Sequence, residues 1–125
     1  MPSVRFACLV ALVAMVLWQN TARADSNTYL VEAKEHFQRL DYDKAVKALR
    51  AAIGRADNST SEVLDIYRLM GICLASMGKE AEAEEAFSRL LAIEPEYRFP
   101  TDRSPRLTAP LEKARSRAGE GIQFK

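Results

Sequence analysis

The chain has 125 residues, 48% of them hydrophobic, and its 18 Lys and Arg residues almost balance 17 Asp and Glu residues. A formal net charge of +1 excludes the strong basic excess of a typical nucleic-acid-binding protein. The length favours one domain, and five Gly and five Pro residues exclude a collagen-like or low-complexity chain.

Residues 1–24 have the composition of a secretory signal peptide. The apolar run 6–18 is shorter than the roughly 20 residues that a helix needs to span a bilayer. Ala22 and Ala24 place small residues where a signal peptidase requires them, which predicts cleavage between Ala24 and Asp25. The alternative is an uncleaved N-terminal anchor.

Cleavage would leave residues 25–125, with Cys73 as the one remaining cysteine. An exported protein with a single Cys has no internal disulfide, so its stability must come from packing. This composition favours the bacterial periplasm over a small disulfide-rich extracellular module.

Charge is unevenly distributed along the mature chain. Residues 25–96 hold 14 acidic and 9 basic groups, whereas residues 97–125 hold 7 basic and 3 acidic groups. We expect the charges of the basic C-terminal segment to pair with the acidic body or to stay solvated, rather than to bind a membrane surface or a nucleic acid.

The mature chain shows the pattern of helices throughout. Apolar residues recur at spacings of three and four, the period of one helix face, and no segment alternates as a strand would. The pattern predicts four helices in two hairpins, about 26–56 and 59–95. Helix starts are expected at Asp25 or Ser26, at Asp41, and at a capping box of Ser59 with Glu62, and helix ends at Gly78 and Pro95.

The two hairpins are related by an offset of 38 residues. Small residues recur where two helix axes must approach closely. Large residues recur where a side chain must fill the space against a neighbouring helix. Two copies of a helix–turn–helix hairpin predict a short helical solenoid. The matched pairs are Tyr29 and Tyr67, Ala33 and Gly71, Leu40 and Gly78, Ala45 and Ala83, Ala48 and Ala86, Leu49 and Phe87, and Ala52 and Leu90.

The second hairpin resembles a tetratricopeptide repeat, because Tyr67, Met70, Gly71, Leu74, Gly78, Ala83, Phe87 and Pro95 stand at that family's spacing. The first hairpin matches less fully, since Leu40 replaces the glycine between the helices. The offset of 38 residues exceeds the family's usual period of 34. The four extra residues are expected in the loop around Asn58. The resemblance implies an all-α fold in which two such hairpins form a right-handed solenoid; an unrelated helical bundle is the alternative.

A last helix is predicted at about 104–118. Ser104 can cap it, and Pro105 suits the first helical position. Many exported bacterial tetratricopeptide proteins end similarly, so the resemblance implies a capping helix on the last hairpin. We expect Leu107 and Leu111 to be its buried anchors.

Pro110 conflicts with a regular helix, because it removes a hydrogen bond and clashes with the preceding turn. Either the helix is kinked there, or it begins near Thr108 and holds Pro110 in its first turn. Residues 119–125 are expected to form a flexible tail.

The family resemblance also implies a concave groove lined by the first helix of each hairpin. An apolar strip with two cations there would suit a peptide that has apolar side chains and some negative charge. Alternatively, Leu30, Phe37 and Ile72 are core residues, covered by the last helix or by a second copy of the protein. The groove residues carried over are Leu30, Lys34, Phe37, Gln38, Arg68, Leu69, Ile72 and Ser76.

Residues typical of catalysis or of metal binding are almost absent. His36, the single imidazole, has no Cys, Asp or Glu at a ligand spacing that would recruit it, and no neighbouring base is indicated for Cys73. We therefore expect no catalytic residues, no cofactor and no metal.

These observations predict an exported, non-enzymatic adaptor that binds a protein or peptide partner in the groove, in a bacterial envelope assembly. No nucleic acid is expected, and a membrane only through an uncleaved signal. One alternative is a self-associating dimeric subunit, because two repeats are fewer than the three or so usually needed for stability. Another is a small-ligand-binding or catalytic protein with a cavity under the cap.

Overall fold

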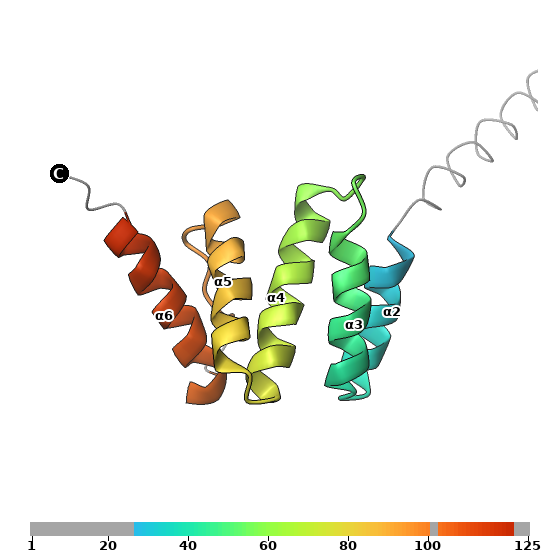
Figure 1. Ribbon diagram of the computed structural model, residues 1–125, viewed down its shortest axis with the longest axis horizontal. Coiled ribbons are helices and arrows are strands. Elements are labelled where there is room, and N and C mark those ends of the chain that lie inside the picture. The colour runs from blue at the N-terminus through green and yellow to red at the C-terminus, as the bar shows by residue number, and fades with distance from the viewer. Residues whose placement is uncertain (1–26, 101–102, 122–125) are drawn as a thin grey trace, which may run out of the picture.

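The computed structural model describes residues 27–100 and 103–121. Over these residues the protein is all-α, as predicted, and contains no strand. The helices lie side by side in chain order (Figure 1); each packs against the next, α2 also contacts α4, and α4 contacts α6. They are α2 Thr28–Gln38, α3 Tyr42–Ile53, α4 Thr60–Ser76, α5 Glu80–Ile93 and α6 Pro105–Gly121.

We call α2 with α3 hairpin 1, and α4 with α5 hairpin 2. The predicted signal peptide 1–24 and the cleavage site between Ala24 and Asp25 lie outside the described residues. Within the described ranges, no helix is both long enough and apolar enough to cross a membrane.

The cap of α2 is Asn27, not Asp25 or Ser26 as predicted. Its buried amide donates hydrogen bonds to the Ala52 carbonyl oxygen (3.0 Å) and to Asn58 Oδ1 (2.6 Å), and its own oxygen accepts from the Leu30 N–H (3.4 Å). One side chain therefore has three roles: it caps α2, closes hairpin 1, and ties it to the loop before α4.

The turns inside the two hairpins have the same geometry. Leu40 and Gly78, which the sequence offset pairs, have positive φ angles of 60° and 76°. In each turn the N–H of the following residue donates to the carbonyl five residues earlier, at 2.9 Å. This is the Schellman pattern, which favours glycine at the positive-φ position. Gly78 thus ends α4 as predicted, and Leu40 adopts the same conformation without being glycine.

The two hairpins also match where their helices approach most closely. A Cβ atom added at Gly71 would lie 2.6 Å from Cζ of the Phe87 ring, so the site has no room for a methyl group. The offset pairs these residues with Ala33 and Leu49, and all four side-chain positions are buried. One hairpin therefore combines the smallest residue with a large ring, and the other combines alanine with leucine.

The start of α4 and the end of α5 follow their local signals. Ser59 Oγ accepts from the Glu62 N–H (3.2 Å), and Glu62 Oε1 accepts from the Ser59 N–H (3.5 Å), which completes the predicted capping box. The last residue of α5 is Ile93, two residues before Pro95, as expected from proline's missing N–H.

The last helix runs parallel to α5, whereas the helices before it alternate in direction (Figure 1). Lys113 is paired with Glu80, and Arg117 Nε lies 2.8 Å from Glu84 Oε1, so both helices advance by four residues in the same direction. Lys113 and Arg117 of the basic C-terminal segment thus pair with the acidic body, whereas Arg98 and Arg106 stay exposed. Between the end of α5 and the start of α6 the chain must therefore cover the length of α5, about 21 Å for its 14 residues.

α6 begins at Pro105, so the predicted alternative of a start near Thr108 is wrong. The Thr108 N–H donates to the Ser104 carbonyl (3.1 Å), as a first helical turn requires. Pro110 therefore lies inside the helix, and its ring is fully buried. Burial of this apolar ring compensates in part for the backbone hydrogen bond that proline cannot donate.

One predicted anchor of α6 is fully buried and the other partly. Leu111 is 2% exposed, and Leu107 packs at the margin of the core. The helix extends to Gly121, beyond the predicted end at 118. Residues 119–121 are therefore helical and do not belong to a flexible tail, while residues 122–125 lie outside the described part of the chain.

Candidate functional site

The eight predicted groove residues do not form one exposed surface. Leu30, Leu69 and Ile72 are only 3–5% exposed and belong to the core, so their expected role as free groove surface is wrong. The offset places them on first helices, but the structure packs all three into the core. The remaining predicted residues are half-buried (Phe37, Arg68, Ser76) or exposed (Lys34, Gln38).

Phe37, the expected aromatic anchor, packs within its own hairpin. Its ring centroid lies 6.2 Å from that of Tyr42, at an interplanar angle of 58°. The half-buried ring therefore stabilises the turn between α2 and α3.

The two predicted cations share one carboxylate. Lys34 Nζ lies 3.0 Å from Asp65 Oδ2, and Arg68 donates to Asp65 Oδ1 at 3.2 Å. Burial disfavours the charged carboxylate, but the hydrogen bonds from Lys34 and Arg68 outweigh it and hold the pKa of Asp65 below its usual value of 3.8. Sequence reasoning missed Asp65, because the bridge joins residues 31 positions apart across two hairpins.

Beside α4, the connection after α5 encloses a pocket of about 400 Å³. Arg68 and Ile72 of the predicted set line it, so the structure brings these two together with side chains that the sequence analysis did not assign to a site. The lining residues are Arg68, Ile72, Glu94, Glu96, Tyr97, Arg98, Phe99, Pro100 and Arg103. We call this the loop pocket.

Aromatic contacts shape the loop pocket. The Phe99 ring meets Phe87 edge-on at 5.9 Å and Tyr97 at 5.8 Å. Arg103 lies over the Phe99 ring, 5.9 Å from its centroid. Burial raises the pKa of Tyr97, although the nearby charges of Arg68 and Arg103 oppose that effect.

α6 holds this loop in place. Arg115 of α6 donates to the carbonyl oxygens of Pro95 (2.9 Å) and Tyr97 (2.5 Å). The pocket therefore depends on how α6 holds residues 95–97. The Tyr-Arg-Phe run at 97–99 was the available sequence signal, but only the direction of α6 places it beside α4.

The groups that could do chemistry lie apart from the loop pocket. Cys73 is a free thiol in the core, and burial raises its pKa to about 12, so it is protonated and unreactive at neutral pH. His36 Nε2 lies 3.5 Å from Glu32 Oε1 on one face of α2. Across residues 27–100 and 103–121, no three His, Cys, Asp or Glu side chains are grouped as a metal site would require.

Comparison with known proteins gives no relative of this chain. No protein family, no curated protein and no solved structure matches it. The function must therefore be inferred from the geometry of the described residues and from the sequence.

Proposed function

We propose that this chain is an exported, non-enzymatic adaptor of the tetratricopeptide type, which binds a protein or peptide partner at the loop pocket. The equivalent turns at Leu40 and Gly78 and the matched close contacts at positions 33 and 71 support two copies of one hairpin. A short solenoid of such hairpins presents the first helix of each on one face. Export to the bacterial periplasm rests on residues 1–24 alone.

The observation that carries this proposal is the grouping of arginines and aromatic rings around the loop pocket. Tyrosine and arginine are among the residues that contribute most of the energy in protein interfaces. Asp65 already forms ion pairs with Lys34 and with Arg68. Arg98 forms no ion pair with any described residue. Arg98 and Arg103 are thus the cations available to a partner.

The partner chemistry follows from this lining. The half-buried ring of Phe99 offers apolar surface, and the exposed Arg98 and Arg103 offer charge-assisted hydrogen bonds to a carboxylate. Glu94 and Glu96 also line the pocket, so a strongly acidic ligand is disfavoured. We propose a peptide segment with one apolar side chain and one carboxylate.

Site-specific photo-crosslinking in the native envelope tests this function. A photoreactive amino acid at the exposed Glu96, which also lines the pocket, should give one discrete adduct, and the same group at the exposed Ala92 of α5 should not. Arg103→Glu should abolish the adduct at position 96 without changing the helical circular dichroism signal. Adducts of equal yield at both positions, or an adduct that persists in Arg103→Glu, would contradict the loop pocket as the binding site.

A further inference from the structure

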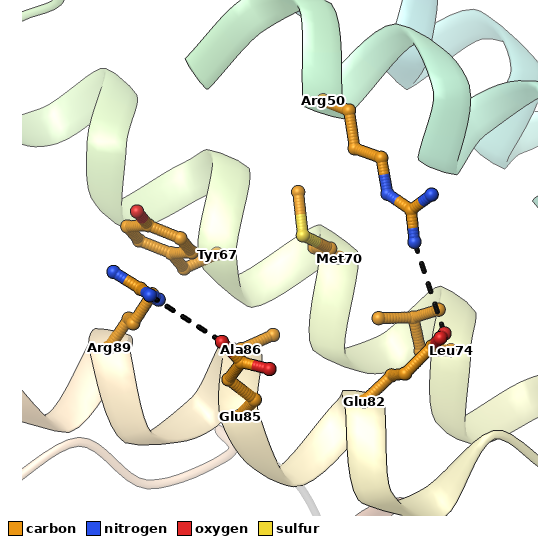
Figure 2. A pocket seen from close by; sticks show the side chains of 8 residues that line it. All are labelled: Arg50, Tyr67, Met70, Leu74, Glu82, Glu85, Ala86 and Arg89. Carbon is orange, nitrogen blue, oxygen red and sulfur yellow. Dashed lines mark hydrogen bonds and ion pairs between the residues drawn. The ribbon is translucent and has the colours of Figure 1, made fainter. Parts of the chain in front are cut away.

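Hairpin 2 has a pocket of about 230 Å³ on the side that faces hairpin 1 (Figure 2). Arg50 of α3 reaches over it and lies 3.9 Å from Glu82 of α5, while Arg89 pairs with Glu85 at 3.5 Å. The pocket is thus the site at which the preceding helix, α3, places the Arg50 side chain. Its lining residues are Arg50, Tyr67, Met70, Leu74, Glu82, Glu85, Ala86 and Arg89.

Hairpin 1 has the same pocket, which we call the end pocket. Its volume is about 350 Å³, and each of its lining residues stands 38 positions before a lining residue of the pocket in hairpin 2. The one counterpart that it lacks is Arg50, the contribution of the preceding helix. The lining residues are Tyr29, Glu32, His36, Lys44, Lys47, Ala48 and Ala51.

No described element covers the end pocket, and its apolar side chains are correspondingly exposed. Tyr29 is 45% exposed and the neighbouring Val31 is 48% exposed. In hairpin 2 the counterparts of these residues, Tyr67 and Leu69, are half-buried and buried because α3 lies against α4. Both hairpins have this pocket, but among the described residues only the pocket of hairpin 2 receives a side chain from a preceding helix.

At two positions of the pocket the charge is reversed between the two hairpins, and Glu32, which also lines the end pocket, lies 3.5 Å from His36. Glu82 and Glu85 of hairpin 2 correspond to Lys44 and Lys47 of hairpin 1. Lys44 contacts Asp41 of its own helix start at 3.3 Å and stays 68% exposed, and Lys47 forms no ion pair within the described residues. Where hairpin 2 accepts an arginine, the end pocket therefore fits a carboxylate.

We propose that the end pocket docks a helix of a partner protein, which places a carboxylate between Lys44 and Lys47 and an apolar side chain against Tyr29. This surface lies on the outer side of hairpin 1 and does not depend on the loop pocket or on what binds there. α3 on hairpin 2 provides the pattern for how such a helix sits.

Two acidic parts of this chain are poor sources of that carboxylate in a second copy. The densest acidic cluster of the chain, on α5, is already paired: its members Glu80, Glu82, Glu84 and Glu85 contact Lys113, Arg50, Arg117 and Arg89, respectively. The sequence before α2 contains a single acidic residue, Asp25, in residues 1–26. Neither segment has carboxylates to spare for two lysines.

Two labelled peptides with the sequence of residues 41–54 test the proposal directly. One keeps arginine at position 50, and the other carries Arg50→Glu; both are cross-linked on their outward face, because a helix this short is marginal in water. Fluorescence anisotropy with the full chain should show that the Arg50→Glu peptide binds at least tenfold more tightly. That preference should shrink as salt rises.

Variants of the protein identify the surface. In Lys44→Glu with Lys47→Glu the preference between the two peptides should reverse, and Tyr29→Ala should weaken both peptides. Lys79→Glu makes a matched charge change at an exposed position outside the end pocket and should leave the preference intact. Circular dichroism of each variant shows whether it remains folded.

Three results would overturn the proposal. Equal affinity of the two peptides for the wild-type protein would show that the end pocket does not favour a carboxylate over an arginine. An unchanged preference in the double lysine variant would show that the peptides bind elsewhere. Sedimentation distinguishes a partner helix from a second copy of this chain. A concentration-dependent dimer that Lys44→Glu with Lys47→Glu dissociates would show that a second copy occupies the end pocket.

Discussion

Hairpins 1 and 2 share their backbone turns but differ in what surrounds them. α4 lies between its neighbours and has seven buried residues, whereas α2, at the end of the described array, has two. At one matched pair, Cys73 of α4 is fully buried, and Glu35 of α2 is exposed. The same helical unit is therefore interior or terminal according to the side chains on its outer face, as expected for repeat arrays.

The ends of the array provide the largest expected contrast. Leu111 of α6 is 2% exposed and covers hairpin 2, while Tyr29 is 45% exposed at the open end of hairpin 1. Leu111→Ala should lower the free energy of unfolding by about 2–5 kcal/mol, because it leaves a cavity in a packed site. Tyr29→Ala should change it by less than about 1 kcal/mol, as is usual for exposed positions. Urea unfolding followed by circular dichroism measures both.

Equal losses of stability in these two variants would contradict the comparison. They would mean that the outer face of α2 is as well covered as that of α5. A large loss in Tyr29→Ala that depends on protein concentration would instead indicate a bound second copy.

The next contrast lies at the closest helix contact of each hairpin. Gly71→Ala would bring a methyl group to within 2.6 Å of Phe87 Cζ. Such overpacking costs about 1–3 kcal/mol, more than the roughly 1 kcal/mol that alanine gains over glycine in a helix. We therefore expect a net loss of about 1 kcal/mol, measured by thermal unfolding.

Hairpin 1 supplies the compensating change, since it combines Ala33 with Leu49. Gly71→Ala together with Phe87→Leu should be less destabilised than the sum of the two single variants, because the smaller side chain makes room for the methyl group. Additive losses would show that positions 71 and 87 are not coupled in the way the matched pair suggests.

Local signals in the sequence were sufficient for the helices and for several of their ends. The Ser59 capping box, the stop before Pro95 and the end at Gly78 each depend on residues within one turn. The cap at Asn27 was missed because Asp25, Ser26 and Asn27 are all favoured cap residues, so the local pattern does not choose among them. The bonds of the Asn27 amide to Ala52 and Asn58, which favour this residue, join positions far along the chain.

The candidate site was harder to predict for the same reason. Asp65 takes up the charge of Lys34 only because α2 and α4 are neighbours. The loop pocket exists only because α6 runs parallel to α5, which brings residues 94–100 and Arg103 back to α4. A periodic pattern predicts which face of a helix is apolar, but not the direction in which a capping helix crosses it.

A smaller effect is expected from the two turns. Leu40 is 69% exposed and has a φ angle of 60°, a conformation that costs a residue with a Cβ about 1–2 kcal/mol. Leu40→Gly should raise the free energy of unfolding by up to about 1 kcal/mol, since glycine's greater freedom in the unfolded chain offsets part of the gain. Gly78→Ala should have the opposite sign. Paired chemical denaturation curves compare the two, and a loss of stability in Leu40→Gly would mean that its side chain makes contacts worth more than the strain.

The smallest expected effect concerns the ion pair that joins the hairpins. The pKa of Asp65 is below its usual value of 3.8, because the hydrogen bonds from Lys34 and Arg68 outweigh burial. A carboxyl group whose pKa is lower in the folded than in the unfolded protein contributes stability that is complete above the unfolded pKa and is lost as pH falls through the folded pKa. The contribution should therefore be constant at neutral pH and disappear below about pH 4.

Titration of the Asp65 side chain by NMR tests this directly. The wild-type pKa should lie below 3.8. Lys34→Met should raise this pKa, because it removes the hydrogen-bonding cation that hairpin 1 contributes and leaves only Arg68. Asp65→Asn should reduce the loss of stability between pH 5 and pH 2 only slightly, since all three side chains are partly exposed and solvent screens their interaction. An Asp65 pKa that does not respond to Lys34→Met would mean that Arg68, within hairpin 2, accounts for the shift and that the bridge between hairpins has no energetic role.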